Sequence, residues 1–179
     1  NQNFGQIIST VSPTLQTVTT LTALSPTGML GYGIPETSLT KAVKEYDIDY
    51  IACDAGSIDQ GPNYLAQGKL LADSQMVERD LRLLLSVRNR LDVPLMISSA
   101  GGSGSKEHVD STVDIVRKIA REEELALELA VIYTDVAPKL LHENRDSISV
   151  LDYQRDITPT DIENAKKIVA QVGPEPYIK

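Results

Sequence analysis

Glycine and serine are concentrated in one segment of the sequence, Ser98-Ser99-Ala100-Gly101-Gly102-Ser103-Gly104-Ser105. The segment follows a predicted strand and precedes a predicted helix. Glycines let a ligand approach the backbone closely, and the N–H groups at the start of a helix favour negative charge. The spacing matches neither the Walker phosphate loop nor the three-glycine dinucleotide fingerprint. We therefore expect either contact with a small anionic ligand or a simple turn between strand and helix.

Two carboxylates follow another predicted strand, within the run that begins at Asp54 and continues to Tyr64. Asp54 and Asp59 are the predicted catalytic residues, because either could act as a general base. The same pair could bind a divalent cation through its oxygen atoms, which is the one cofactor that the sequence suggests. The alternative is an Asx turn, in which Asp54 only accepts hydrogen bonds from nearby N–H groups.

Other residues of the predicted loops complete the expected site. Tyrosine and lysine side chains there could orient a carboxylate or carbonyl group, and glycines and serines could contact it through backbone or hydroxyl groups. The predicted ligand-binding residues are Gly28, Tyr32, Ser57, Tyr64, Lys69, Ser99, Gly101, Gly102, Ser103, Gly104 and Ser105. Cys53 lies in an apolar run with no histidine nearby, which favours packing over nucleophilic chemistry. His108 is expected to be exposed in the first turn of a helix, or to touch a ligand.

Hydrophobic periodicity indicates alternating strands and helices. Strands are predicted over 18–24, 49–54, 93–99 and 127–133, with a short edge strand over 148–153. Helices are predicted after Pro35 with Thr37 or Ser38 as the cap, over 77–91 with Asp80 on the solvated side, after the N-cap Ser105, and over 138–144. A last helix is expected to start at a capping box formed by Thr160 and Glu163 and to end at Gly173.

This alternation predicts an α/β fold with three layers, a mostly parallel sheet flanked by helices as in Rossmann-like proteins. In such sheets, ligands bind where loops leave the carboxyl ends of the strands. The two polar segments described above, the loop 25–33 and Thr134-Asp135 should therefore share one edge. We expect residues 22–179 to form this domain, preceded by an uncharged arm or strand over 1–21.

Composition excludes several classes of partner. The 179 residues carry a formal net charge of −8, which opposes binding to nucleic acid and to anionic membranes. The chain has no apolar run of the roughly 20 residues that a membrane helix needs. A single cysteine favours a reducing compartment. We therefore expect a soluble cytoplasmic protein.

Several short motifs together resemble the acyclic terpene utilisation protein family, also called AtuA-like proteins. The similarity runs from about Thr22 to Lys179 and rests on the segments Ser25 to Gly33, Cys53 to Ser57, Gly61-Pro62, Gly68-Lys69 and Ser99 to Gly102. Members of the family are considerably longer, so the chain resembles their N-terminal portion. The resemblance implies catabolism of branched terpenoid-type carboxylic acids or their coenzyme A thioesters.

Two main hypotheses follow. In the first, the chain is an enzyme or part of one, a lyase or hydratase, acting on a small branched carboxylic acid or its thioester. In the second, it is a noncatalytic small-molecule-binding or assembly subunit that completes a site with a partner chain. Nucleotide binding is a third interpretation. A homo-oligomer or a partner chain is expected, because an incomplete sheet exposes an edge that must be covered.

Overall fold

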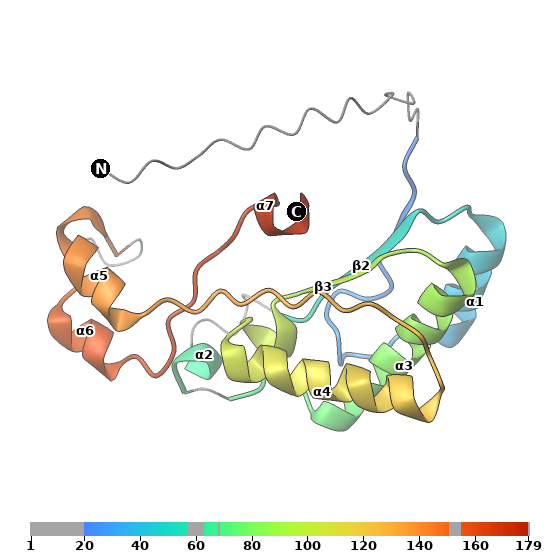
Figure 1. The fold of residues 1–179 in the computed structure, drawn as a ribbon, viewed down its shortest axis with the longest axis horizontal. Coiled ribbons are helices and arrows are strands. Elements are labelled where there is room, and N and C mark those ends of the chain that lie inside the picture. The colour runs from blue at the N-terminus through green and yellow to red at the C-terminus, as the bar shows by residue number, and fades with distance from the viewer. Residues whose placement is uncertain (1–19, 57–62, 68, 151–154, 179) are drawn as a thin grey trace.

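The computed structural model describes residues 20–56, 63–67, 69–150 and 155–178. In chain order, the first elements are β1 (Ala23–Leu24), α1 (Glu36–Glu45), β2 (Tyr50–Asp54), α2 (Asn63–Gln67), α3 (Ser74–Leu91), β3 (Leu95–Ser98) and α4 (Lys106–Glu122), shown in Figure 1. The later helices are α5 (Pro138–Asn144), α6 (Pro159–Asn164) and α7 (Glu175–Ile178). Short 3-10 turns occupy Ala100–Gly102 and Arg145–Ser147.

The three strands form a parallel sheet in the order β1-β2-β3. Within it, Ile51 of β2 lies opposite Leu95 of β3, and Cys53 lies opposite Ile97. Parallel strands require crossover connections, which the helices between them provide. The prediction of an α/β fold with a parallel sheet is therefore confirmed.

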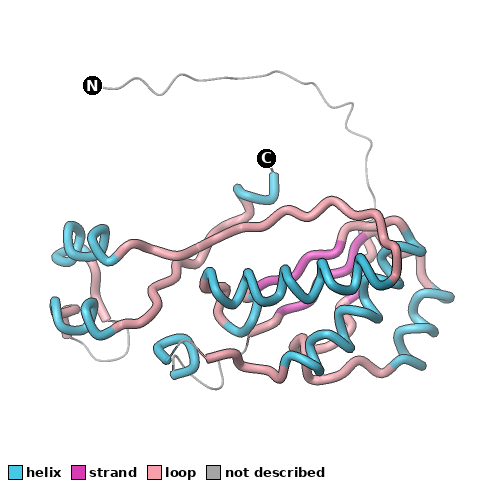
Figure 2. Tube along the Cα trace, turned by 60° about the horizontal axis from the view of Figure 1, so that its bottom comes forward, coloured by secondary structure: helices cyan, strands magenta, loops and turns pink. Residues whose placement is uncertain are grey.

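The core lies between the sheet and helices α3 and α4, which run beside the strands in Figure 2. Ile51 in the central strand, Leu84 in α3 and Ile119 in α4 are each 0% exposed. Burial of one such side chain contributes about 1.5–3 kcal/mol relative to leaving it in water. The helix α3 begins where the Asp73 side chain accepts a hydrogen bond from the Gln75 N–H at 2.8 Å, an ordinary N-cap.

The predicted helix starts are only partly correct. Helix α1 is present, but its N-cap residue is Pro35, and neither Thr37 nor Ser38 has that role. The fixed φ of proline suits the residue that leads into a helix, so no side-chain cap is required. Helix α4 does follow Ser105 at its N-cap position, although the Ser105 side chain makes no capping hydrogen bond.

The predicted strand over 127–133 is wrong. These residues form an extended loop that runs from the end of α4 towards α5 (Figure 1). The chain just beyond them pairs with the returning C-terminal segment, through a bridge between Asp135 and Val169 and a hydrogen bond from the Val136 N–H to the Ile168 carbonyl at 2.9 Å. An apolar, β-rich segment favours extended backbone, but a strand also needs a neighbouring strand for its hydrogen bonds.

The capping box of the last predicted helix also lies elsewhere. Thr158 and Asp161 form it, not Thr160 and Glu163: the Asp161 N–H donates to the Thr158 hydroxyl at 3.2 Å, and the Thr158 N–H donates to the Asp161 carboxylate at 2.8 Å. Pro159 then fills the first helical position, where its missing N–H is not needed. The local proline, rather than the Thr-to-Glu spacing, therefore decides where α6 begins.

The remaining C-terminal predictions have mixed outcomes. Helix α6 ends at Asn164, so Gly173 does not end it. An antiparallel bridge joins Ser149 to Asp156 near the predicted edge strand 148–153, of which residues 151–154 lie outside the described residues. Most of the predicted arm 1–21 lies outside them as well.

Candidate functional site

Hydrogen bonds from a side chain and from the backbone join the carboxyl ends of β2 and β3. The Ser98 hydroxyl donates to Oδ1 of Asp54 at 3.0 Å, and the Ala55 N–H donates to the Ser98 carbonyl at 2.9 Å. The Gly56 N–H also donates to Oδ1 of Asp54 at 3.0 Å, which is the Asx turn that the sequence allowed. Among the described residues, Oδ2 of Asp54 has no hydrogen-bond partner, and the side chain is exposed. The carboxylate is thus held through one oxygen.

The glycine-rich loop lies directly against this turn. A Cβ atom on Gly56 would lie 2.7 Å from Cβ of Ser99 and 3.0 Å from the Gly102 carbonyl oxygen, closer than real side chains approach. The loop itself turns through positive φ at Ser99 (48°), Gly101 (72°) and Gly104 (70°). Asp54 and the loop 98–105 therefore lie at the same end of the sheet, as the parallel topology predicts.

Most of the amide groups in this loop bond to the loop itself. The Gly102 N–H donates to the Ser99 carbonyl at 2.8 Å, and the N–H groups of Ser103 and Gly104 donate to the Ala100 carbonyl. Those three donors cannot also bind an anion in this conformation. The N–H groups at the start of α4 are better placed for that purpose, because the Ser105 side chain does not cap them, although the Glu107 N–H donates to its own carboxylate.

Ser105 marks this helix start. The residue is 0% exposed, and its hydroxyl oxygen has no hydrogen-bond partner among the described residues. Thr134 lies close by and donates to the Gly104 carbonyl at 3.4 Å. A salt bridge between Lys167 and Glu107 connects the C-terminal segment to the same first turn.

The loop 25–33 is tied to the same end of the sheet. The Leu30 N–H donates to the Asp54 carbonyl at 2.7 Å. The N–H groups of Gly31 and Gly33 donate to Oδ2 of Asp80 at 2.9 and 3.0 Å. Asp80 was expected on the solvated side of α3 but is 0% exposed, so that prediction is wrong. Its spacing of three residues after Val77 is the helical signal that could have placed it on the buried face.

The remaining predicted ligand-binding residues belong to the loop after β1 and to the connection between β2 and α3. Gly28 and Tyr32 belong to the loop after β1, where Tyr32 is 60% exposed. Tyr64 lies in α2, and its carbonyl accepts a hydrogen bond from the Lys69 N–H at 2.9 Å. Residues 57–62, which include Ser57 and Asp59, are outside the described residues.

The proposed cation has no complete set of ligands in the described part of the chain. No group of three or more His, Cys, Asp or Glu side chains there could hold a metal ion. Asp54 is the one predicted cation ligand within the described residues, and a single carboxylate does not make a divalent cation site.

A pair of side chains that sequence reasoning did not connect lies at the start of α4. The hydroxyl oxygen of Ser103 is 2.8 Å from Nδ1 of His108. His108 is 3% exposed, so the expectation of an exposed first-turn histidine is wrong. The cause is the missing side chain of Gly101, since a Cβ atom there would lie 2.5 Å from Cβ of His108.

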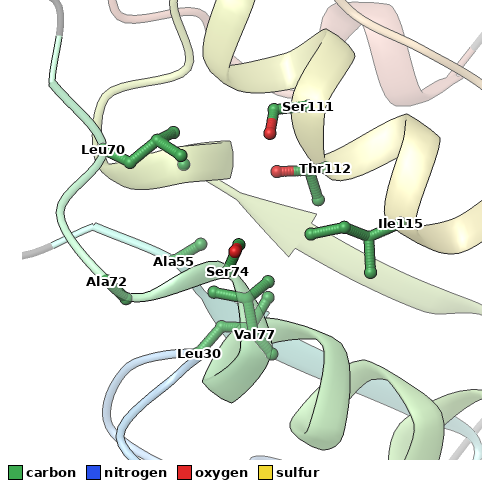
Figure 3. Close-up of a pocket in the computed structure, with 10 residues that line it drawn as sticks. Leu30, Ala55, Leu70, Ala72, Ser74, Val77, Ser111, Thr112 and Ile115 are labelled. Atoms are coloured by element: carbon green, nitrogen blue, oxygen red, sulfur yellow. The ribbon is translucent and has the colours of Figure 1, made fainter.

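A small cavity lies behind the glycine loop, between the starts of α3 and α4 (Figure 3). Its volume of about 20 Å³ is enough for roughly one water molecule. Figure 3 shows Val77 of α3 and Ile115 of α4 facing each other across it, with Thr112 beside them. The cavity is too small for an organic ligand.

Cys53 has the packing role that the sequence suggests. Its side chain is 4% exposed in the central strand. Burial, together with the negative charges of Asp80 and Asp54, raises the pKa of the thiol to about 11. A thiol with this pKa is protonated at neutral pH and is a poor nucleophile.

Comparisons with known proteins identify no relative: no family model, curated protein or solved structure matches the chain. In the described part of the chain, no helix has both the length and the apolar character needed to cross a bilayer.

Proposed function

We propose that the edge formed by the ends of β2 and β3 is the active site of an enzyme, or of part of one, that acts on a small branched carboxylic acid or its coenzyme A thioester as a lyase or hydratase. The observation that carries this proposal is the 3.0 Å hydrogen bond from Ser98 to Asp54, which places an exposed carboxylate beside the glycine loop. The resemblance to acyclic terpene utilisation proteins suggests the substrate class and the catabolic role.

Asp54 acts as the general base in this proposal. Ser98 and Gly56 fix one carboxylate oxygen, so the other can face a substrate from a defined position. It would remove a proton from the carbon next to the substrate carbonyl, or from the water that adds to a double bond. Asp59 would serve as the second acid or base, or would join Asp54 in holding a divalent cation.

The first turn of α4 binds the negatively charged end of the substrate. Its N–H groups carry the positive end of the helix dipole, and Ser105 leaves them without a side-chain cap. Tyr32 and Lys69 from neighbouring loops, and Tyr64 from α2, orient the substrate. The same proposal includes a three-layer, Rossmann-like domain over 22–179, which acts in the cytoplasm.

A second candidate function is a noncatalytic binding or assembly subunit. Met96, in the middle of β3, is 37% exposed, which is unusual for a strand of a small parallel sheet. A second copy or a partner chain would cover it and complete the site. Light scattering after size exclusion would test this, since a protein that stays monomeric at high concentration does not assemble with itself.

The catalytic proposal is tested by Asp54→Asn, which keeps an acceptor for the Asx turn but removes the base. With a panel of branched acyl-coenzyme A thioesters, including saturated, unsaturated and hydroxylated ones, we expect turnover to fall by at least about 100-fold. The melting temperature should change little. Asp49→Asn is the matched control, because Asp49 also accepts a backbone hydrogen bond, from Thr22 at 2.7 Å, but precedes β2.

Two results would overturn the catalytic proposal. The first is the absence of turnover with every member of the panel in the unsubstituted protein. The second is an Asp54→Asn variant that loses thermal stability but keeps full turnover, because Asp54 would then be only a turn residue.

A further inference from the structure

Ser103 and His108 form a polar pair to which the proposed role of Asp54 assigns no function. The 2.8 Å separation of the Ser103 hydroxyl oxygen from Nδ1 of His108 is within the range expected for a serine nucleophile and its base. Ser103 is half-buried and can be reached from solvent, whereas the histidine is enclosed. A reactive hydroxyl that is accessible beside a shielded imidazole is the arrangement that nucleophilic catalysis needs.

The local hydrogen bonds are compatible with the direction of proton transfer that this chemistry requires. The Ser105 N–H donates to the Ser103 hydroxyl oxygen at 3.5 Å. That oxygen has a second lone pair and one proton, so it can accept from Nδ1 of His108 or donate to it, according to the tautomer of the imidazole. Proton transfer from the serine requires Nδ1 to be the acceptor, with the ring proton on Nε2.

The histidine ring is held in place by its surroundings. It packs on Gly101, where any side chain would collide with it. One helical turn later, the Thr112 hydroxyl donates to the His108 carbonyl at 2.9 Å. A base that is fixed in this way does not have to be ordered again for each reaction cycle.

The same turn offers donors for the negative charge that develops on a carbonyl oxygen. Helix α4 begins at Lys106, three residues after Ser103, and the Ser105 side chain does not cap it, although the Glu107 N–H donates to its own carboxylate. Backbone N–H groups at a helix start stabilise an oxyanion electrostatically. Nucleophile, base and oxyanion donors thus come from one short stretch, residues 103–108.

We propose that Ser103 is a nucleophile activated by His108 and that the pair hydrolyses esters or thioesters of small carboxylic acids. The serine oxygen attacks the carbonyl carbon while its proton moves to Nδ1 of His108. The carbon–sulfur or carbon–oxygen bond then breaks, and the leaving thiol or alcohol takes that proton. Water next attacks the acyl-serine and gives a proton to Nδ1. The bond between the acyl carbon and the serine oxygen breaks, the serine oxygen takes that proton from Nδ1, and the carboxylic acid is released.

This inference goes beyond the lyase or hydratase proposal and does not depend on Asp54. It is tested on the full chain with an alkyl fluorophosphonate, which labels activated serines, followed by peptide mass spectrometry. We expect one adduct, on Ser103, which disappears in Ser103→Ala. Labelling should be at least about 100-fold slower in His108→Gln. Ser111→Ala, one turn further along α4, should label like the unsubstituted protein.

The tautomer of His108 gives a second test that needs no substitution. Long-range nitrogen–proton NMR spectra should show the ring proton on Nε2 and an acceptor at Nδ1. A proton on Nδ1, an adduct at another serine, or no adduct at all would each overturn the inference. Asp54→Asn keeps the Ser103 adduct if the two proposals are independent, so each can fail without the other.

Discussion

Residues 20–122 and residues 123–178 are held together by different interactions. In the first region, paired strands and two long helices bury side chains such as Leu84 completely. In the second, short helices leave large apolar side chains in solvent, among them Leu140 at 54% and Ile178 at 78% exposed. Its ordered contacts are largely on the surface, such as the 2.6 Å salt bridge between Arg155 and Asp161. Within the described residues, the first region holds nearly all of the buried side chains, and Ile162 of α6, at 2% exposed, is the exception in the second.

The candidate site follows this division. Asp54, Ser98, Ser103 and His108 all belong to the first region. The second region reaches the site through the first two turns of α4, where Tyr133 donates a hydrogen bond to Asp110 at 2.7 Å. The proposed reactive side chains thus come from the first region, and the second region contacts the same edge of the sheet.

The largest expected difference between the regions is in how much stability the protein loses when one leucine side chain is shortened to alanine. Leu84→Ala should reduce the free energy of unfolding by about 2–5 kcal/mol, because it leaves a cavity in a fully buried core. Leu129→Ala, at a position that is 43% exposed, should cost less than about 1 kcal/mol. Urea denaturation of both variants measures this. Equal losses would show that the two regions contribute to the core alike.

A smaller effect is expected from Asp80→Ala. The substitution leaves the buried N–H groups of Gly31 and Gly33 without their acceptor, at a cost of about 2–4 kcal/mol. Hydrogen exchange of these two amides should accelerate together. Asp114→Ala, on the exposed side of α4, is the control. Slow exchange at Gly31 and Gly33 in the Asp80 variant would contradict the role given to this carboxylate.

Glycines of the loops 25–33 and 98–105 should differ in how much stability is lost when each is replaced by alanine. Gly101→Ala places a side chain at positive φ and against His108, which should cost about 1–3 kcal/mol. Gly28→Ala meets no atom within 4 Å and should be neutral or stabilise by a few tenths of a kcal/mol. Thermal unfolding of both variants distinguishes them, and a stable Gly101→Ala protein would argue against the packing of His108 on this loop.

The smallest effect concerns pH and lies in the second region. Hydrogen bonds from Arg155 and then Thr158 hold the pKa of Asp161 well below its usual value. A carboxylate whose pKa is lowered by folding stabilises the folded protein at pH values above its pKa in the unfolded chain. This stabilisation is lost as the pH falls below about 4. The amide signals of α6 should therefore shift at acidic pH, and Asp161→Asn should abolish this shift. An acid shift in α6 that persists in Asp161→Asn would contradict the role given to this carboxylate.

The first region could largely be predicted from the sequence, because local patterns and tertiary pairing agree there. Helix periodicity predicted α3 and α4, and apolar β-rich runs predicted β2 and β3. Parallel topology then placed Asp54 beside the glycine loop without further information. Composition alone could not predict the conformation of residues 127–133. These residues have the pattern of a strand, but no neighbouring strand in the described part of the chain pairs with them.

The site was less predictable than the fold, since it depends on contacts between distant residues. Nothing local marks Asp80 as the acceptor for Gly31 and Gly33, which are 49 and 47 residues away. The burial of His108 depends on the missing side chain of Gly101, and the pairing of His108 with Ser103 depends on the same close approach. Such close contacts depend on the backbone conformation of the loop. The residue types limit this conformation but do not determine it.

An NMR titration of the nitrogen-labelled protein with 3-methylbutanoate, a small branched carboxylate, tests the central claim most directly. The account predicts saturable shifts at residues 54–56 and 98–108, with the largest at the start of α4 and none in α5 or α6. Shifts confined to α5 and α6, or no shifts at 54–56 and 98–108 at saturating carboxylate, would contradict a ligand site at the end of β2 and β3.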